Sequence, residues 1–272
     1  MIATDSGLNF SFNRVAAMVR RYWYLLRSSW PRVLDLVYWP TVQMLMWGFL
    51  QLYVSQHGGL FVRASGVFIG AVLLWDILFR GQLGFSISFL EEMWSHNLGN
   101  LMMSPLRPVE FIAALMIMSI VRLLIGMIPV TLLAVAFFGF NLWSLGFALV
   151  AFFVNLILTS WAIGVFVAGL LLRNGMGAES MAWTIMFLFL PLTCVYYPVT
   201  VLPHLLQYVA WALPPTYVFE GMRALLIEHV FRADLMVEAL AFNVVLFAAA
   251  SFAFVKLLQS ARVQGSLLQA GE

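Results

Sequence analysis

The sequence predicts an all-α membrane protein with six transmembrane helices. Hydrophobic residues make up 63% of the 272-residue chain and charged residues only 10%, whereas soluble domains carry about one quarter charged residues. A helix needs about 20 apolar residues to cross the hydrocarbon core of a bilayer. Six hydrophobic stretches are long enough, at 33–54, 65–87, 110–138, 143–172, 181–202 and 237–257. The segments between them are short, so we expect one membrane domain over 1–272.

Basic residues predict how these spans are oriented, because Lys and Arg favour the cytoplasmic side of short loops. An even number of spans places both termini on the same side. With that side in the cytoplasm, only Arg63, Arg223 and Arg232 lie outside, and most other basic residues lie inside. We therefore expect both termini to be cytoplasmic.

The segment 12–30, before the first span, is expected to contain an amphipathic helix. Its apolar residues share one helical face and its arginines another; the sets are Val15, Met18, Val19, Tyr22, Leu25 and Leu26, and Arg14, Arg20, Arg21 and Arg27. Such a helix lies in the headgroup layer with its arginines toward anionic lipid. Pro31 permits the turn into the first span. The alternative is a frayed cytoplasmic arm.

The segment 91–104 connects the second and third spans and is expected to form a short cytoplasmic helix that ends at Ser104-Pro105. In a helix, Trp94, Leu98, Leu101 and Met102 share one face. The other face carries Glu92, Ser95, His96, Gly99 and Asn100. Held rigidly between two spans, this helix can transmit a push from a soluble partner into the membrane.

Ionisable side chains inside spans are costly and therefore indicate function. Asp76 and Arg80 are one helical turn apart, which favours either a mutual ion pair or contact with a substrate. Arg122 has no local partner; it could pair with Asp76 or Asp35, reach the interface, or face an aqueous cleft.

Aromatic and polar side chains in the spans allow two interpretations. Trp39 and Trp47, with Tyr38 and Tyr53, could line a path for sugars or amphipathic lipids, or pack spans together and lie in interfacial belts. Asn155, Thr159 and Ser160 in the fourth span are similarly ambiguous, because such groups often hydrogen-bond to neighbouring helices.

The segment 203–223, after the fifth span, is rich in proline, and its apolar part is too short to cross the membrane. We expect a re-entrant or interfacial segment on the external side, serving as a lid or exit; an ordinary external loop is the alternative. Glu220 and Arg223 are three residues apart and can form an ion pair.

Three of these features, in chain order, resemble the membrane subunit of a bacterial ABC-2 type exporter. They are the amphipathic helix before the first span, the Glu-rich segment that ends in Ser104-Pro105, and the proline-rich stretch that ends in Glu220-Gly221-Met222-Arg223. The resemblance covers nearly the whole chain. One departure is the run from His96 to Gly99, where the family usually carries a Gly-Thr step.

The resemblance implies a permease subunit in the bacterial inner membrane that moves a hydrophobic or amphipathic substrate (lipid, drug or glycan) outward by alternating access. It implies a homodimer, surrounded by membrane lipids, with two copies of a separate cytosolic ABC ATPase. ATP and Mg would bind that partner, because the only lysine, Lys256, lacks the preceding glycines of a phosphate-binding loop. We therefore expect no catalytic residue and no cofactor in this chain.

The resemblance, taken with the charged, aromatic and proline-rich features described above, predicts roles for individual residues. ATPase coupling would involve Glu91, Glu92, Trp94, His96, Leu98, Gly99, Asn100 and Leu101. On this interpretation Trp94, Leu98 and Leu101 anchor the helix, and the polar members meet the partner or solvent. The substrate path would include Trp39, Trp47, Asp76, Arg80 and Arg122. The external gate would include Pro203, Pro214, Pro215, Glu220 and Arg223.

Other classes of protein fit the residues less well. A channel or a lipid-modifying membrane enzyme without an ATPase partner is the main alternative. An enzyme needs converging acids, bases or metal ligands, but the four histidines are scattered and form no pair at metal-binding spacing. We expect no metal site. The net charge of +2 gives no indication of nucleic-acid binding.

Overall fold

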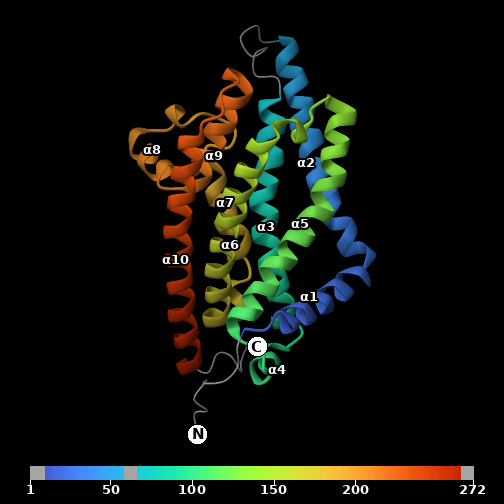
Figure 1. The fold of residues 1–272 in the computed structure, drawn as a ribbon, viewed down its shortest axis with the longest axis vertical. Coiled ribbons are helices and arrows are strands. Elements are labelled where there is room, and N and C mark those ends of the chain that lie inside the picture. Colours follow the sequence, from blue (N-terminus) through green and yellow to red (C-terminus); the bar gives the residue numbers. More distant parts are fainter. Residues whose placement is uncertain (1–9, 58–65, 265–272) are drawn as a thin grey trace.

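The computed structural model describes residues 10–57 and 66–264, and every regular element in these ranges is helical. The long helices run roughly side by side along the long axis of the molecule (Figure 1). Helix α4 lies at one end, which we call the α4 end, and α8 lies near the other, the α8 end. Helix α1 and the last turns of α10 both lie toward the α4 end.

Five helices in the described ranges are long and apolar enough to cross a membrane. They match five of the six predicted spans, with ends that differ by up to seven residues. Their bounds are α2, Trp30–His57; α3, Val67–Trp94; α5, Pro108–Phe138; α6, Phe147–Asn174; and α10, Ala233–Gln264. The 3₁₀ turn η2, Leu142–Leu145, connects α5 to α6, and η3, Gly175–Ala178, follows α6.

The predicted span 181–202 is not one continuous helix. Helix α7, Met181–Leu192, has only 12 residues and therefore rises about 18 Å, less than the hydrocarbon thickness. Cys194 has a φ of +54°, a left-handed conformation that a helix cannot continue through. Irregular chain and the 3₁₀ turn η4, Val199–Val201, follow. Proline at 198 also disfavours a longer helix.

Helix α1, Phe12–Arg27, confirms that the predicted amphipathic segment is helical. It ends at Arg27 rather than at residue 30. Its buried residues are Val15, Met18, Tyr22 and Leu26, four of the six predicted apolar positions. Leu25 is exposed. This face packs chiefly on α5, so part of the predicted lipid-facing apolar surface contacts protein.

The predicted helix 91–104 is divided into two helices. Helix α3 continues through Trp94, a turn follows, and α4, Leu98–Met103, is a separate short helix. His96 adopts a left-handed φ of +51°, which interrupts the helix. The faces predicted from one continuous helix therefore do not exist as such, and Glu91 and Glu92 belong to the last turn of α3.

The segment 203–223 contains two short helices, α8, His204–Trp211, and α9, Pro214–Arg223. A π-helical segment, η5, Ala224–Glu228, extends α9 before α10 begins. Neither α8 nor α9 is long enough to span a membrane. Pro214 and Pro215 occupy the first turn of α9, where the missing proline N–H costs no hydrogen bond.

Helix α3 is the central helix. Most of its apolar stretch is buried (83%), compared with 17% for α2 and for α10. Helix α2 approaches α5 closely at a glycine, because a Cβ on Gly126 of α5 would lie only 2.6 Å from the Leu36 carbonyl oxygen of α2.

Polar side chains join α6 to α10. Thr159 donates to Asn243 at 2.6 Å, and Asn243 donates to Asn155. Asn155 and Thr159 of the fourth predicted span therefore join helices, as one interpretation predicted, whereas Ser160 donates to the Ile157 carbonyl of its own helix.

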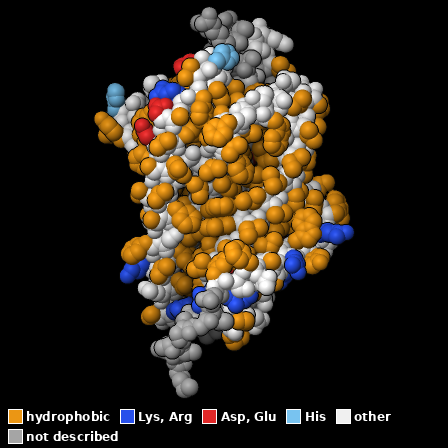
Figure 2. Space-filling model, in the orientation of Figure 1, with side chains coloured by type: hydrophobic (Ala, Val, Ile, Leu, Met, Phe, Trp, Pro, Cys, Tyr) orange, Lys and Arg blue, Asp and Glu red, His pale blue; other side chains and the backbone are white. Residues whose placement is uncertain are grey.

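The surface is apolar around the middle of the molecule. Figure 2 shows a broad band of hydrophobic side chains, with Lys and Arg gathered toward the α4 end and both signs of charge near the opposite end. An apolar band between polar ends is the pattern of a protein that crosses a bilayer.

Candidate functional site

Three carboxylates at the α4 end hold arginines from other helices. The first is Glu110, in the first turn of α5, which is buried. Arg14 of α1 donates two hydrogen bonds to it, Nε to Oε2 at 2.8 Å and Nη2 to Oε1 at 2.6 Å. The backbone N–H groups of Ser11 and Arg107 donate as well. This paired geometry is the strong form of an Arg–carboxylate contact, and the Glu110 hydrogen bond raises the pKa of Arg14.

Glu92 is the second carboxylate and joins α3 to α1. It is buried, and Arg21 Nη2 donates to its Oε2 at 3.0 Å. Asn97, in the turn before α4, donates to the same oxygen at 2.8 Å. Glu92 therefore connects α1, α3 and the turn that leads into α4.

Glu91 is the third carboxylate and joins three long helices. Arg122 of α5 donates to its Oε2 at 2.8 Å, and Arg32 of α2 donates to its Oε1 at 3.2 Å. The Glu91 and Arg122 side chains are almost completely buried. Arg122 thus pairs with Glu91, and neither Asp76 nor Asp35 is its ion-pair partner.

The outer surface of this end is formed by Trp94 and α4. Trp94 is partly exposed, and its Nε1 donates to Glu179 at 3.3 Å. His96, Gly99 and Asn100 are exposed. Leu98 is buried, and Leu101 packs against the main core, as expected for anchoring residues. Trp94 instead belongs to the exposed surface, and the inward-facing groups are the two glutamates.

In the middle of α3, Asp76 and Arg80 form the ion pair that the sequence allowed. Asp76 Oδ1 lies 3.7 Å from Arg80 Nε, too far for a hydrogen bond. Asp76 is fully buried, and neither of its carboxylate oxygens has a hydrogen-bond partner. It interacts electrostatically with Tyr196, and Arg80 with Asp35. A buried charged group without hydrogen bonds is costly, so this pair needs a functional or structural reason.

The two tryptophans of the predicted substrate path have different surroundings. Trp47 is half-buried and stacks on Tyr196, with ring centroids 4.1 Å apart. It also stacks on Phe68 at 6.1 Å. Trp39 is exposed on α2 and contacts the neighbouring Tyr38 edge to face. Trp47 therefore lies beside the region of Asp76, and Trp39 faces outward.

Near the α8 end, Glu220 and Arg223 form the predicted ion pair, Nη2 to Oε1 at 2.9 Å. Arg223 Nη1 also donates to the Cys194 carbonyl at 2.9 Å, and Glu220 Oε1 accepts from the Val199 N–H at 2.8 Å. The pair thus connects α9 to the irregular chain after α7. Pro203 precedes α8 and is exposed, whereas the two prolines of α9 are buried.

Apart from Trp39, the predicted residues form three groups along the molecule: one at the α4 end, one around the middle of α3 and one near the α8 end. Sequence reasoning missed several residues of the first group: Arg14, Arg21, Arg32, Asn97, Glu110 and Glu179. A signal was present, because Arg14 and Arg21 are seven residues apart on one helical face. Three glutamates lie at the ends of predicted spans and need cationic partners. The described ranges contain no group of His, Cys, Asp and Glu that could hold a metal ion.

Fold and site together define a multi-pass, all-helical membrane protein with polar groups at both ends and a buried ion pair between them. Residues 14–227 match the model of the ABC-2 type transporter family. The chain therefore belongs to that family, as a membrane domain. No curated protein matches the chain.

Proposed function

We propose that this chain is the transport subunit of an ATP-driven exporter and works as a homodimer with two copies of a separate ABC ATPase. Family membership supports a permease domain of the non-catalytic kind. In this proposal the α4 end lies in the cytoplasm of a bacterium. The dimer moves a hydrophobic or amphipathic compound outward by alternating access.

One observation carries the proposal: the last turn of α3, next to α4, is tied by ion pairs to three other helices. Glu92 holds α1, and Glu91 holds both α2 and α5. A displacement of α4 by an ATPase would therefore act directly on α3 and on the three helices that are tied to it. Side chains joined by buried ion pairs move together, because separating them leaves buried charge uncompensated.

In this mechanism the ATPase pushes on the exposed part of the segment 91–104. Glu91 and Glu92 transmit the displacement to the other helices. Trp94, His96, Gly99 and Asn100 would contact the ATPase, and Leu98 and Leu101 hold α4 to the core. ATP binding would favour one arrangement of the helices only if the ATPase binds that arrangement more tightly. Hydrolysis would then reset the molecule.

The middle of the molecule would form the substrate path, and the α8 end would form its external gate. Asp76 and Arg80 supply a buried charged pair, and Trp47 stacks on Tyr196, which interacts electrostatically with Asp76. The short α7 and the irregular chain after it would complete a sixth crossing. Glu220 and Arg223 would hold α9 as a gate against that chain.

Co-purification with candidate ATPases tests the proposal. We would co-express the chain with ABC ATPase subunits, determine the mass of the detergent-purified complex, and measure ATP hydrolysis for wild type and Trp94→Asp. The matched control is Val263→Asp, which changes an exposed apolar residue near the end of α10.

We expect a two-plus-two complex whose assembly or ATP turnover fails in Trp94→Asp and is retained in Val263→Asp. If the chain stays alone with every candidate ATPase, the exporter proposal is wrong, and a channel or enzyme must be considered again. If a complex forms but Trp94→Asp behaves like wild type, coupling does not pass through this surface.

A further inference from the structure

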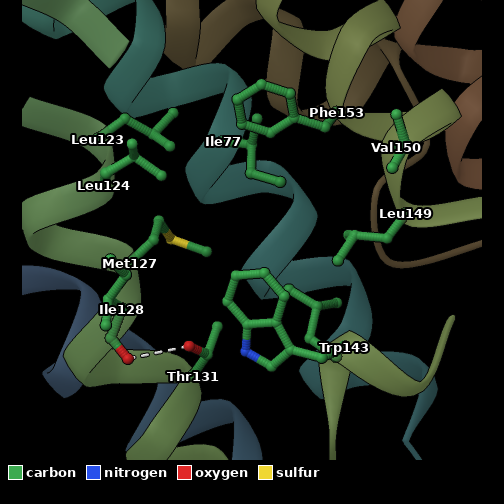
Figure 3. A pocket seen from close by; sticks show the side chains of 11 residues that line it. Ile77, Leu123, Leu124, Met127, Ile128, Thr131, Trp143, Leu149, Val150 and Phe153 are labelled. Atoms are coloured by element: carbon green, nitrogen blue, oxygen red, sulfur yellow. Dashed lines mark hydrogen bonds between the residues drawn. The ribbon is translucent and has the colours of Figure 1, made fainter. Parts of the chain in front are cut away.

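An apolar groove on the membrane-facing surface lies between α5 and α6. Leu123, Leu124, Met127 and Ile128 of α5 form one wall, and Leu149, Val150 and Phe153 of α6 form the other. Ile77 of α3 lies at its base and Trp143 of η2 at one end (Figure 3). The groove encloses a cavity of about 200 Å³.

The lining offers little to a polar ligand, because its only polar side-chain groups are the Thr131 hydroxyl and the indole N–H of Trp143 at one end. Thr131 carries the only side-chain hydroxyl in it, and that hydroxyl donates to the Ile128 carbonyl of its own helix at 2.9 Å (Figure 3). Apolar cavities of about 150 Å³ stay dry and take up hydrocarbons. A water molecule would find too few hydrogen-bond partners here.

The position of the groove indicates which kind of molecule would occupy it. Both walls belong to helices long and apolar enough to cross the membrane, so the groove opens into the hydrocarbon layer. From Leu123 to Thr131, α5 rises about 12 Å, which suits a chain lying along the helix. The exposed Trp143 closes the end nearest the α8 end of the molecule, and tryptophan is enriched where a bilayer meets water.

We propose that this groove holds one acyl chain of a membrane phospholipid, with the headgroup beyond Trp143 at the surface nearest the α8 end. The walls of the groove are apolar, so they recognise the acyl chain and not the headgroup. None of the residues that line the groove belongs to the proposed substrate path, and the inference does not depend on an ATPase partner. A resident lipid here would fill the gap between α5 and α6 and brace them against α3.

Native mass spectrometry of the purified full chain tests this proposal. The protein would be exchanged into detergent with phosphatidylcholine, and separately with phosphatidylglycerol, and then delipidated stepwise. Val150→Phe places a ring in the groove. Val244→Phe makes the same change on α10 and is the matched control, because Val244 is similarly exposed (64%, against 55% for Val150).

We expect wild type and Val244→Phe to retain one phospholipid per protomer after the others have been removed, with either headgroup. At the same step of delipidation, the fraction of Val150→Phe that retains the phospholipid should be at least tenfold lower. Thr131→Val should retain it, because that hydroxyl bonds only to its own helix. The melting temperature of each variant in detergent shows that it is folded.

Three results of the lipid measurement would overturn the proposal, and so would one change in oligomeric state. The three are a wild type that keeps no lipid, a folded Val150→Phe that keeps it as wild type does, and retention restricted to one headgroup. If Val150→Phe instead breaks a dimer, the groove is occupied by a second copy and the lipid assignment is wrong. None of these results bears on ATP-driven transport, which the co-purification experiment tests.

Discussion

At the scale of single residues, Asp76 is the side chain whose position is hardest to explain by packing alone. Its carboxylate is fully buried in the apolar middle of α3, and neither oxygen has a hydrogen-bond partner. Arg80 neutralises the charge across 3.7 Å without a hydrogen bond. Replacing a buried ion pair by apolar residues is often neutral or stabilising, whereas removing one partner is strongly destabilising. This difference provides a test of whether the two charges depend on each other for stability.

We therefore predict opposite effects on stability for single and double substitutions. Asp76→Leu alone should cost about 3 kcal/mol, because it leaves Arg80 buried without its nearest carboxylate. Asp76→Leu combined with Arg80→Met should be at least as stable as wild type. The melting temperature in detergent measures both. A single variant as stable as the double would mean that the two charges do not depend on each other.

Transport by the double variant then decides the role of the pair. If the pair contacts substrate, the double variant should assemble with the ATPase and hydrolyse ATP but lose transport of the compound that the wild-type complex moves. Normal transport by the stable double variant would show that the pair serves only the packing of α3.

At the scale of secondary-structure elements, the α4 end is held together by ion pairs between helices that are distant in the sequence. Helix α1 contributes Arg14 and Arg21, α2 contributes Arg32, and α5 contributes Arg122. The arginines of α1 divide into two kinds. Arg14 and Arg21 contact protein carboxylates, whereas Arg20 and Arg27 are exposed and can face anionic headgroups. Helix α1 therefore attaches both to the bundle and to the membrane surface.

Arg122→Leu should loosen the junction of α2, α3 and α5. Its removal leaves the nearly buried Glu91 with only the half-exposed Arg32. We expect a loss of about 3 kcal/mol, near the low end for breaking a buried pair because one partner remains. The corresponding fall in melting temperature is several degrees, measured in detergent against Arg20→Leu on the exposed face of α1. Normal stability, assembly and transport in Arg122→Leu would remove Arg122 from both the coupling network and the substrate path.

At the scale of the whole molecule, charge is distributed unequally between the two ends. Basic side chains gather toward the α4 end (Figure 2), and the start of α1 and the end of α10 both lie toward that end (Figure 1). Since basic residues favour the cytoplasmic side, the α4 end should be cytoplasmic and α8 external. The buried Cys194 is the only cysteine, which makes labelling of introduced cysteines a direct test.

In whole cells, a membrane-impermeant thiol reagent should label Leu205→Cys and leave Met103→Cys unlabelled until the membrane is permeabilised. Both positions are 81% exposed, so accessibility within the protein is matched. The wild-type chain, which retains Cys194, reports the background. The reverse labelling pattern would place α4 outside and would contradict both the orientation and the proposed ATPase contact.

Local features of the sequence were enough to predict the class of protein, the five long helices and the amphipathic nature of α1. This was possible because span length and helical periodicity are local properties of the chain. The sequence also allowed the Asp76–Arg80 and Glu220–Arg223 pairs, whose members lie within one helical turn. These features need no knowledge of which helices are neighbours.

Which distant residues meet depends on how the helices pack together. The glutamates at 91 and 92, predicted to face a partner or solvent, turn inward because arginines of α1, α2 and α5 lie there. Trp94 is exposed because the helix breaks at His96, and the predicted fifth span ends early because the chain turns at Cys194. Each of these outcomes depends on contacts between segments far apart in the sequence, and periodicity along one helix cannot predict them.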